Sequence, residues 1–257
     1  NFNDGANALT QLSSGNIGIT GYTHVDPGNQ DIWVIQLDSD GNENWRRTFG
    51  GNQLDVGHDI LPAANGGMFI LCETHSMGDV QGDIWILEID SEGNPLDTLV
   101  IGGNGMQIAY SFQKSPLGGY ALCGTMSGTT SGTTDFAIFR IDDYGGKVWE
   151  RRFGGAYNDA AYSIVYSDDG WVSVGQTYSF SSGQGDLWVI KVGQNGEYIW
   201  DQVFGKEYDD EALHIGIASD NGFIISGSTF SPEYQNNGLL LKTDTRGNYQ
   251  GMVEYRP

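Results

Sequence analysis

Basic residues are scarce in this sequence: 12 Lys and Arg stand against 33 Asp and Glu, which gives a formal net charge of -21. Nucleic-acid binding needs a basic face that replaces the counterions of the phosphates, so this balance excludes that class of protein. The same charge disfavours binding to anionic membranes. No run of about 18 apolar residues occurs, so we expect no membrane insertion. Such an acidic surface is typical of a protein that stays soluble in an extracellular or salt-exposed setting.

Cysteine is nearly absent, since the chain has only Cys72 and Cys123. When the repeats described below are aligned, these two residues are one position out of step. Along a strand they would therefore point to opposite faces. Disulfide geometry disfavours a bridge between such positions, so we expect two buried free thiols.

A unit of 51 or 52 residues occurs five times, and this repeat predicts the fold. The segment GNENW at 41–45 recurs in register at 93–97, 145–149, 196–200 and 247–251. The Asp31-Ile-Trp33 segment recurs with the same step. Several columns that match over the whole chain indicate a repeat architecture.

Each unit contains four short segments rich in Val, Ile, Trp, Tyr and Thr, bounded by Gly, Asn, Asp and Ser, which is typical of strands and hairpins. In the fourth unit these segments are 160–166, 171–177, 186–192 and 198–204. No window has a helical period with caps at both ends. Four antiparallel strands in about 50 residues are typical of a β-propeller blade. We therefore predict an all-β, five-bladed β-propeller in a single domain, 1–257, with blades at about 3–51, 52–103, 104–155, 156–205 and 206–257.

The repeat resembles a known group of proteins through its Gly-x-x-x-Trp segment, present at 41–45, 145–149 and 196–200. Together with Asp-x-Trp and Phe-Gly-Gly, this pattern is similar to repeats of secreted or surface proteins of Bacteroidetes and some archaea. Those repeats have tryptophan-docked blades like the quinoprotein propellers. The resemblance implies a fold and an extracellular or cell-surface location, but no single activity. Five blades do not supply the eight-bladed ring and cofactor seat of quinoprotein enzymes, and Asp97 and Gly251 replace the docking tryptophan in two units, so we expect no cofactor.

The turn Asp38–Asn42 places three oxygen-bearing side chains close together, which would suit calcium. Its four counterparts keep the glycine but not the oxygen ligands. A turn that needs Gly at positive φ explains the column without a metal, so we predict no metal site there. Trp45, just after the turn, is expected to pack the outer strand onto its blade.

An acidic column opens the first strand of each blade. Its members are Asp4, Asp55, Gln107, Asp159 and Asp210. These carboxylates would ring one mouth of a central channel and bind a cation or sugar hydroxyls. Alternatively, each one accepts N–H groups of its own inter-blade turn. Asp55, Asp159 and Asp210 are retained as candidate ligand-binding residues, with both interpretations open.

The loops between second and third strands differ most between the repeats. Their first residues are His24, His75, Ser127, Tyr178 and Phe230, and the inter-blade loops on the same face add Tyr157 and Tyr208. Aromatic rings beside small polar residues suit sugar stacking with hydrogen bonding, and they also suit a protein-binding face. The aromatic and histidine residues of this set are therefore candidate ligand-binding residues.

No catalytic motif is present: the chain has no Gly-x-Ser-x-Gly, no HExxH, no clustered Cys/His spacing and no phosphate loop. Asp59 and His214 share one inner-strand column and form the best acid/base candidates, but no pair is assigned as catalytic. The N-terminal residues show no initiator Met and no basic or apolar stretch, which indicates a mature or trimmed end. The residues favour a non-catalytic extracellular binding or scaffold module, part of a larger secreted protein or assembly, that recognises a polysaccharide or cell-surface protein. The alternative is a propeller enzyme that cleaves glycosides with central carboxylates.

Overall fold

A computed structural model describes residues 4–26, 28–78, 80–128, 132–182, 184–233 and 235–255. The described residues form twenty β-strands. They form no helix, and therefore no helix that is long and apolar enough to cross a membrane. The chain divides into two compact units, Asn1–Tyr110 and Ser111–Pro257, which we call unit 1 and unit 2. Each unit is described by itself.

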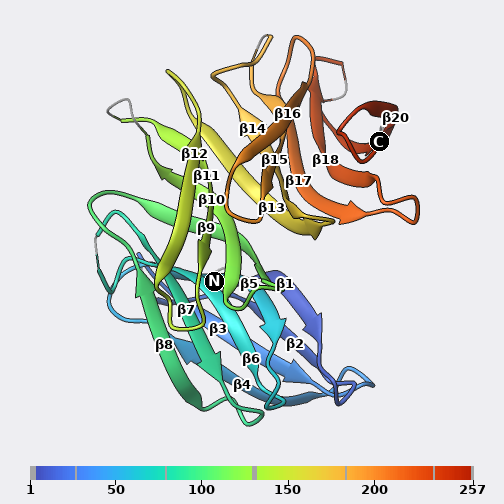
Figure 1. The fold of residues 1–257 in the computed structure, drawn as a ribbon. Helices are drawn as coiled ribbons and strands as arrows, with labels where there is room; N and C mark the ends of the chain where they lie inside the picture. The colour runs from blue at the N-terminus through green and yellow to red at the C-terminus, as the bar shows by residue number, and fades with distance from the viewer. Residues whose placement is uncertain are drawn as a thin grey trace. The chain divides into compact units, whose positions relative to one another are not determined.

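Five antiparallel sheets of four strands follow the five repeats, which confirms the predicted five-bladed β-propeller fold (Figure 1). Blade 1 contains β1 (Gly5–Gln11), β2 (Ile17–Asp26), β3 (Asn29–Leu37) and β4 (Glu43–Phe49). Blade 2 contains β5 (Asp55–Pro62), β6 (Met68–Thr74), β7 (Asp83–Ile89) and β8 (Pro95–Ile101). Blade 3 contains β9 (Gln107–Lys114), β10 (Tyr120–Ser127), β11 (Thr134–Ile141) and β12 (Lys147–Phe153). Blade 4 contains β13 (Asp159–Ser167), β14 (Gly170–Thr177), β15 (Asp186–Gly193) and β16 (Tyr198–Phe204). Blade 5 contains β17 (Asp210–Ile217), β18 (Phe223–Ser231), β19 (Gln235–Thr243) and β20 (Tyr249–Tyr255).

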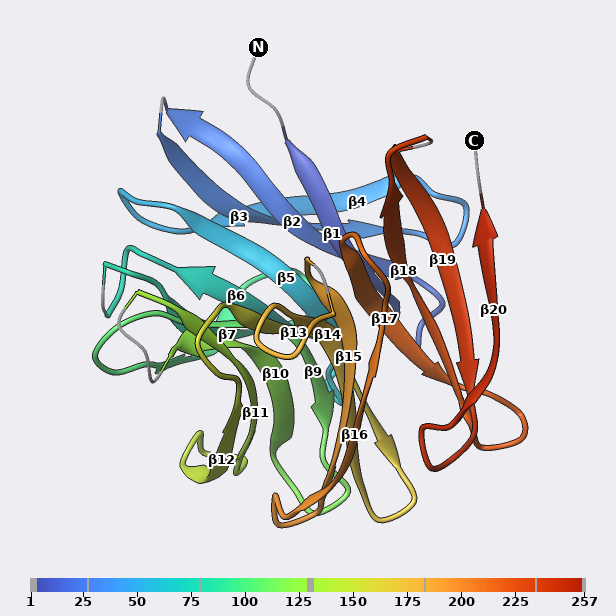
Figure 2. The same cartoon turned by 90° about the horizontal axis from the view of Figure 1, so that it is seen from above.

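The strands of each blade lie in chain order, and Figure 2 shows this for β17 to β20. In blade 4, each predicted strand agrees with the observed one to within one residue at each end. The boundary between the two units falls inside β9. The single-domain expectation stays a prediction.

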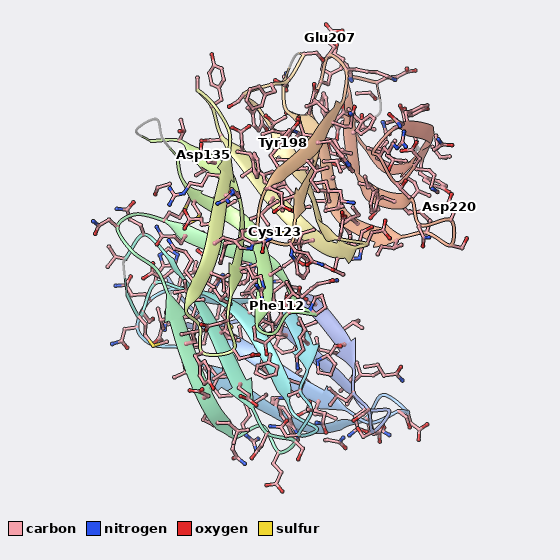
Figure 3. All side chains as sticks on the ribbon, viewed as in Figure 1. Phe112, Cys123, Asp135, Tyr198, Glu207 and Asp220 are labelled. Carbon is pink, nitrogen blue, oxygen red and sulfur yellow. The ribbon has the colours of Figure 1, made fainter. Side chains whose placement is uncertain are left out.

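The core consists of apolar side chains that alternate along strands sandwiched between blades. β15 is buried along its whole length. Trp188 and Ile190 pack against blade 3, whereas Leu187 and Val189, on the opposite face, pack against blade 5. This arrangement follows from the period of two along a strand with both faces covered. Neither cysteine belongs to a disulfide and both are fully buried, as predicted; Cys123 is labelled on β10 in Figure 3.

A β-bulge interrupts the first strand at the same column in four blades. The extra residue in the register is Asn7, His58, Tyr162 or Leu213. A bulge leaves one residue outside the ladder and re-aims its side chain. In blades 1, 4 and 5 a glycine on the second strand makes room for this backbone: a Cβ on Gly175, for example, would clash with the carbonyl of Ala160. Blade 2 has Cys72 at this position.

The tryptophan after the strand 3–4 turn docks on the next blade, not only on its own. Trp149 Nε1 donates to the carbonyl of Gln194, 2.9 Å away, and a Cβ on Gly196 would lie 2.8 Å from the indole. Trp45 makes the equivalent bond to the carbonyl of Ser91 at 3.0 Å. The expectation that Trp45 packs the outer strand onto its own blade was therefore incomplete, because the indole reaches the turn of the following repeat.

Each blade has two distinct ends. We call the end with the strand 2–3 loops and the inter-blade loops the loop end, and the end with the strand 1–2 and strand 3–4 turns the turn end. In blade 5, Glu207 lies on the inter-blade loop and Asp220 on the β17–β18 turn, at opposite ends of the sheet (Figure 3).

Candidate functional site

In blades 2 and 4, three side chains meet at the loop end: those of the bulge residue, the next-to-last residue of the second strand, and the residue that opens the strand 2–3 loop. In blade 2 they are His58, Glu73 and His75, and in blade 4 they are Tyr162, Gln176 and Tyr178. The bulge makes this meeting possible because it turns a first-strand side chain toward the second strand. These positions hold different chemistry in different blades, so they are the strongest candidates for specific function.

In blade 2, Glu73 bridges two imidazoles. Its Oε2 lies 3.1 Å from His58 Nε2 and its Oε1 lies 2.6 Å from His75 Nε2. The three side chains are largely buried, and the His58 ring packs edge-on against Tyr110 with the centroids 5.0 Å apart. Burial alone would raise the pKa of Glu73, but the hydrogen bonds and charges of the two histidines lower it below its usual range.

In blades 4 and 5, two tyrosines, an amide and two carboxylates come together within unit 2. Tyr178 hydrogen-bonds through its side chain to Asp209 and Gln176. Asp209 Oδ1 also accepts the N–H of Gly185 at 2.8 Å. Burial, followed by the charge of Asp209, raises the pKa of Tyr178. Tyr178 as a whole residue is still 40% exposed, so part of this positionally fixed tyrosine remains accessible.

A second tyrosine in unit 2 lies deeper. Burial, the Glu211 carboxylate and Tyr178 raise the pKa of Tyr162 to about 12, so its hydroxyl keeps its proton at all ordinary pH values. Glu211 Oε1 accepts a hydrogen bond of 2.9 Å from Ser228 Oγ. The site thus presents neutral hydroxyl and amide groups around two engaged carboxylates.

Aromatic side chains extend this surface along the loop end of unit 2. The Tyr208 and Phe230 rings contact each other edge-on with centroids 5.9 Å apart. Tyr157 is 63% exposed and is tied to blade 4, because its N–H bonds to Ser179 Oγ at 3.1 Å. The predicted residues Tyr157, Tyr178, Tyr208 and Phe230 therefore all belong to the loop end of blades 4 and 5. Whether a ligand contacts them stays a prediction.

His24 and His75 belong to unit 1. His24 Nε2 lies 2.9 Å from Gln30 Nε2, and its ring packs edge-on against Tyr22. His75 is part of the blade 2 cluster described above. A ligand contact by either residue also stays a prediction.

The predicted carboxylates of the first strands are buried inside the joints between blades. Asp159 Oδ1 accepts from Thr177 Oγ1 at 2.5 Å and its Oδ2 accepts from Ser179 Oγ at 2.6 Å. Asp55 makes the equivalent bonds, and Asp210 accepts the N–H of Lys206 at 3.0 Å. All three side chains are nearly or fully inaccessible. These contacts favour the alternative in which the column fastens each inter-blade turn, and a ligand contact stays a prediction.

The best acid/base candidates, Asp59 and His214, lie in different units. Asp59 Oδ1 accepts the N–H of Ile60 at 2.8 Å, and His214 Nδ1 lies 3.1 Å from Ser163 Oγ. Nothing observed at either residue assigns a catalytic role. His58 and Glu211 also interrupt the apolar pattern of the first strand, but the alignment of the five repeats did not single them out. The available signal was an ionisable His or Glu in a column where the other repeats have neither.

The described residues contain no group of three or more His, Cys, Asp or Glu arranged to hold a metal ion. At the Asp38–Asn42 turn, Gly41 has φ +86°, and Asp38 Oδ1 accepts the N–H groups of Asp40 and Asn42 at 2.9 and 2.8 Å. This geometry is the predicted Asx-type turn.

Blade 1 has a hollow of about 140 Å³ beside Trp33. It is lined by Asp4, Thr23, Trp33, Ile35, Arg46, Arg47 and Thr48. The tryptophans at the same position of blades 2 and 4, Trp85 and Trp188, are buried in the packing between blades. This hollow therefore lies on a packing face of the repeat, and we do not assign it to a ligand.

No protein-family model matches the sequence, and no curated protein matches it. Solved structures of similar fold include a protein of unknown function from Dyadobacter fermentans, 12% identical over 100% of this chain and 83% of that one, with a TM-score of 0.64. An endo-arabinase from Bacteroides thetaiotaomicron is 10% identical over 94% of both chains, with a TM-score of 0.53. An α-L-arabinofuranosidase from Lactobacillus brevis is 9% identical over 97% of this chain and 89% of that one, with a TM-score of 0.51. At such identity the likeness supports the propeller fold alone.

Proposed function

We propose that this chain is a non-catalytic, extracellular binding module that recognises a carbohydrate through the loop end of blades 4 and 5. The observation that carries the proposal is the accessible Tyr178 ring, held in position by Asp209 and Gln176. A rigid aromatic face beside fixed hydrogen-bonding groups suits a sugar ring, which has an apolar face and a rim of hydroxyls.

The rest of this surface fits the same ligand. Tyr208, Phe230 and Tyr157 add aromatic area, and the half-buried Ser228 adds a neutral polar group. The net charge of -21 opposes acidic polysaccharides, so neutral or amino sugars are the expected ligands. Two of the structures with similar fold are carbohydrate-active enzymes by name, which supports testing carbohydrates first.

The proposed setting is outside the cell, where the module would belong to a larger secreted protein or assembly and bind a polysaccharide or a cell-surface protein. An acidic, Gly-rich chain with buried free thiols is compatible with this setting. Secretion is tested by fractionating the source cells and probing each fraction with an antibody raised against the chain.

Binding is tested with a panel of neutral, amino and acidic polysaccharides, followed by titration calorimetry with the best oligosaccharide. We expect Tyr178→Ala to weaken binding about tenfold or more, since that loss corresponds to only about 1.4 kcal/mol of contact energy. Tyr178→Phe keeps the ring and should lose less. The matched control is Tyr144→Ala, because Tyr144 is 94% exposed at the turn end of blade 3.

Two results would contradict the proposal. One is the absence of binding to any member of the panel. The other is a Tyr178→Ala variant that keeps the wild-type spectrum and binds as well as wild type. The same panel tests the enzyme alternative. If the wild-type chain hydrolyses a polysaccharide and Asp59→Asn abolishes that activity, the function is glycoside cleavage and not binding alone.

A further inference from the structure

Both ring nitrogens of His75 face hydrogen-bond acceptors. Nδ1 lies 2.8 Å from the carbonyl oxygen of Val80, and Nε2 lies 2.6 Å from Glu73 Oε1. A neutral imidazole carries one N–H and can satisfy only one of these partners. Both hydrogen bonds can therefore form only when the His75–Glu73 pair carries one extra proton, beyond those of a neutral histidine and an ionised carboxylate.

The extra proton belongs on His75. The other oxygen of Glu73, Oε2, lies 3.1 Å from His58 Nε2. A carboxylate that faces two imidazole nitrogens in this way is a poor base. Burial lowers the pKa of His75, but the bond to Glu73, the Val80 carbonyl and the charges of Glu73 and Asp55 together raise it above its usual range. The pKa of Glu73 is lowered, as described above.

The charged ring closes the β6–β7 loop on itself. Its bond to the carbonyl of Val80 spans five residues, and Gly82, with φ +108°, lies over the same ring: a Cβ there would be 3.1 Å from His75 Nε2. The carbonyl of Gly82 in turn accepts the N–H of Gln107 in β9 at 2.8 Å. The imidazole thus links the start of the loop to its end, and the backbone of Gly82 links that end to the next blade.

The other charged and titratable groups around His75 can be assigned by element. From β6 there is Glu73. From β5 there are His58, which acts through Glu73, and Asp55, which accepts hydrogen bonds from Thr74 and Ser76. β9 contributes the neutral Gln107 and the Tyr110 ring against His58. Asp79 in the loop lies outside the described residues.

We propose that the β6–β7 loop is a proton-dependent latch, closed while His75 is an imidazolium between Glu73 and Val80 and released when His75 loses its proton. This device goes beyond carbohydrate recognition and is tested without any ligand. Because the pKa of His75 is raised, its contribution is complete below pH 6.5 and is lost as the pH rises through the folded-state value. Because the pKa of Glu73 is lowered, its contribution is complete above pH 4.5 and is lost as the pH falls further.

The other blades provide controls. The residues at the His75 position are His24, Ser127, Tyr178 and Phe230. His24 faces the amide of Gln30 at 2.9 Å, where His75 has a carboxylate. His24→Gln is therefore the matched variant for His75→Gln.

The direct test is a nitrogen-detected NMR titration of the histidine rings in the whole chain. At pH 6 both ring nitrogens of His75 should be protonated, with a titration midpoint above 6.5, and Glu73→Gln should move that midpoint down. A neutral His75 ring at pH 6 would overturn the proposal. This measurement on the wild-type protein remains decisive even where a variant fails to fold.

The second test is amide hydrogen exchange of residues 75–82, corrected for the intrinsic pH dependence of exchange. Loss of a charge-assisted hydrogen bond should speed exchange by about tenfold between pH 6 and pH 9. His75→Gln should remove this pH dependence, and His24→Gln should leave it intact. Equal corrected exchange of the wild-type loop at both pH values would also refute the latch.

Discussion

A glycine pair in unit 1 tests how the blades are joined. Gly41 and Gly93 occupy the same position of the strand 3–4 turn, with φ of +86° and +81°. Both donate to the carbonyl of the aspartate three residues earlier, at 3.1 and 3.2 Å. They differ in surroundings: a Cβ on Gly41 would meet nothing within 4 Å, whereas on Gly93 it would lie 2.9 Å from the Trp45 ring and 2.9 Å from Arg47 Cγ.

The expected cost of each alanine follows from this difference. At positive φ, alanine costs about 1–2 kcal/mol, and a less flexible unfolded chain returns about 0.4–1 kcal/mol. Gly41→Ala should therefore lower the free energy of unfolding by about 1 kcal/mol. Gly93→Ala bears the same cost and must also displace the indole, which adds about 1–3 kcal/mol of overpacking and puts the Trp45–Ser91 hydrogen bond at risk.

Urea denaturation followed by tryptophan fluorescence and circular dichroism measures both variants. With a slope of about 2 kcal/mol/M, each kcal/mol moves the midpoint by about 0.5 M. Placing both variants in a Trp45→Ala background completes a double-mutant cycle. In that background the excess cost of Gly93→Ala should fall to the smaller cost of displacing the flexible Arg47 side chain. Equal losses for Gly41→Ala and Gly93→Ala in the wild-type background would refute the docking role of Trp45.

Two further predictions concern buried groups. Burial, with a contribution from Asp186, raises the pKa of Asp210. The stability that this carboxyl group contributes is therefore complete below pH 3.8 and is lost as the pH rises through its folded-state pKa. The urea midpoint of Asp210→Asn relative to wild type should be higher at pH 7 than at pH 4, and an unchanged difference would contradict this. Both thiols are fully buried and burial raises the pKa of Cys72, so a thiol reagent should label neither cysteine in the folded chain and both in denaturant; rapid labelling of the folded protein would argue against the packing described.

The strands and turns were predictable because they depend on short-range chemistry that five copies display in parallel. Blade 4 shows this best, since hydrophobic runs and Gly, Asn and Asp turns place its strand ends within one residue. The turn at Asp38–Asn42 was also assigned correctly, because a single Gly at positive φ explains the whole column. The buried free thiols followed from strand parity.

The contacts between repeats were harder to predict, because a register within one unit does not say which blade a side chain reaches. Trp45 docks on Ser91, 46 residues later, and the alignment alone gave no direction for the indole. The bulge caused the second failure. By inserting one residue it breaks the period of two, so His58 comes to face Glu73 and Tyr162 comes near Tyr178, away from where strict alternation would place them.

The same bulge explains why one position of the repeat is free to carry function. The parts around the bulge recur in most blades: a small residue precedes it, a glycine of the second strand fits against the preceding carbonyl in blades 1, 4 and 5, and a buried aspartate fastens the joint in blades 2, 4 and 5. In blade 2, Cys72 takes the place of that glycine. The same register shift occurs around Asn7, His58, Tyr162 and Leu213, so the bulge is compatible with very different side chains. Two partners on the second strand and its loop then decide the chemistry, giving a charged histidine cluster in blade 2 and a tyrosine–amide site in blade 4. Functional differences between the blades are therefore expected at these three columns, while the Asp, Gly and Trp columns preserve the scaffold.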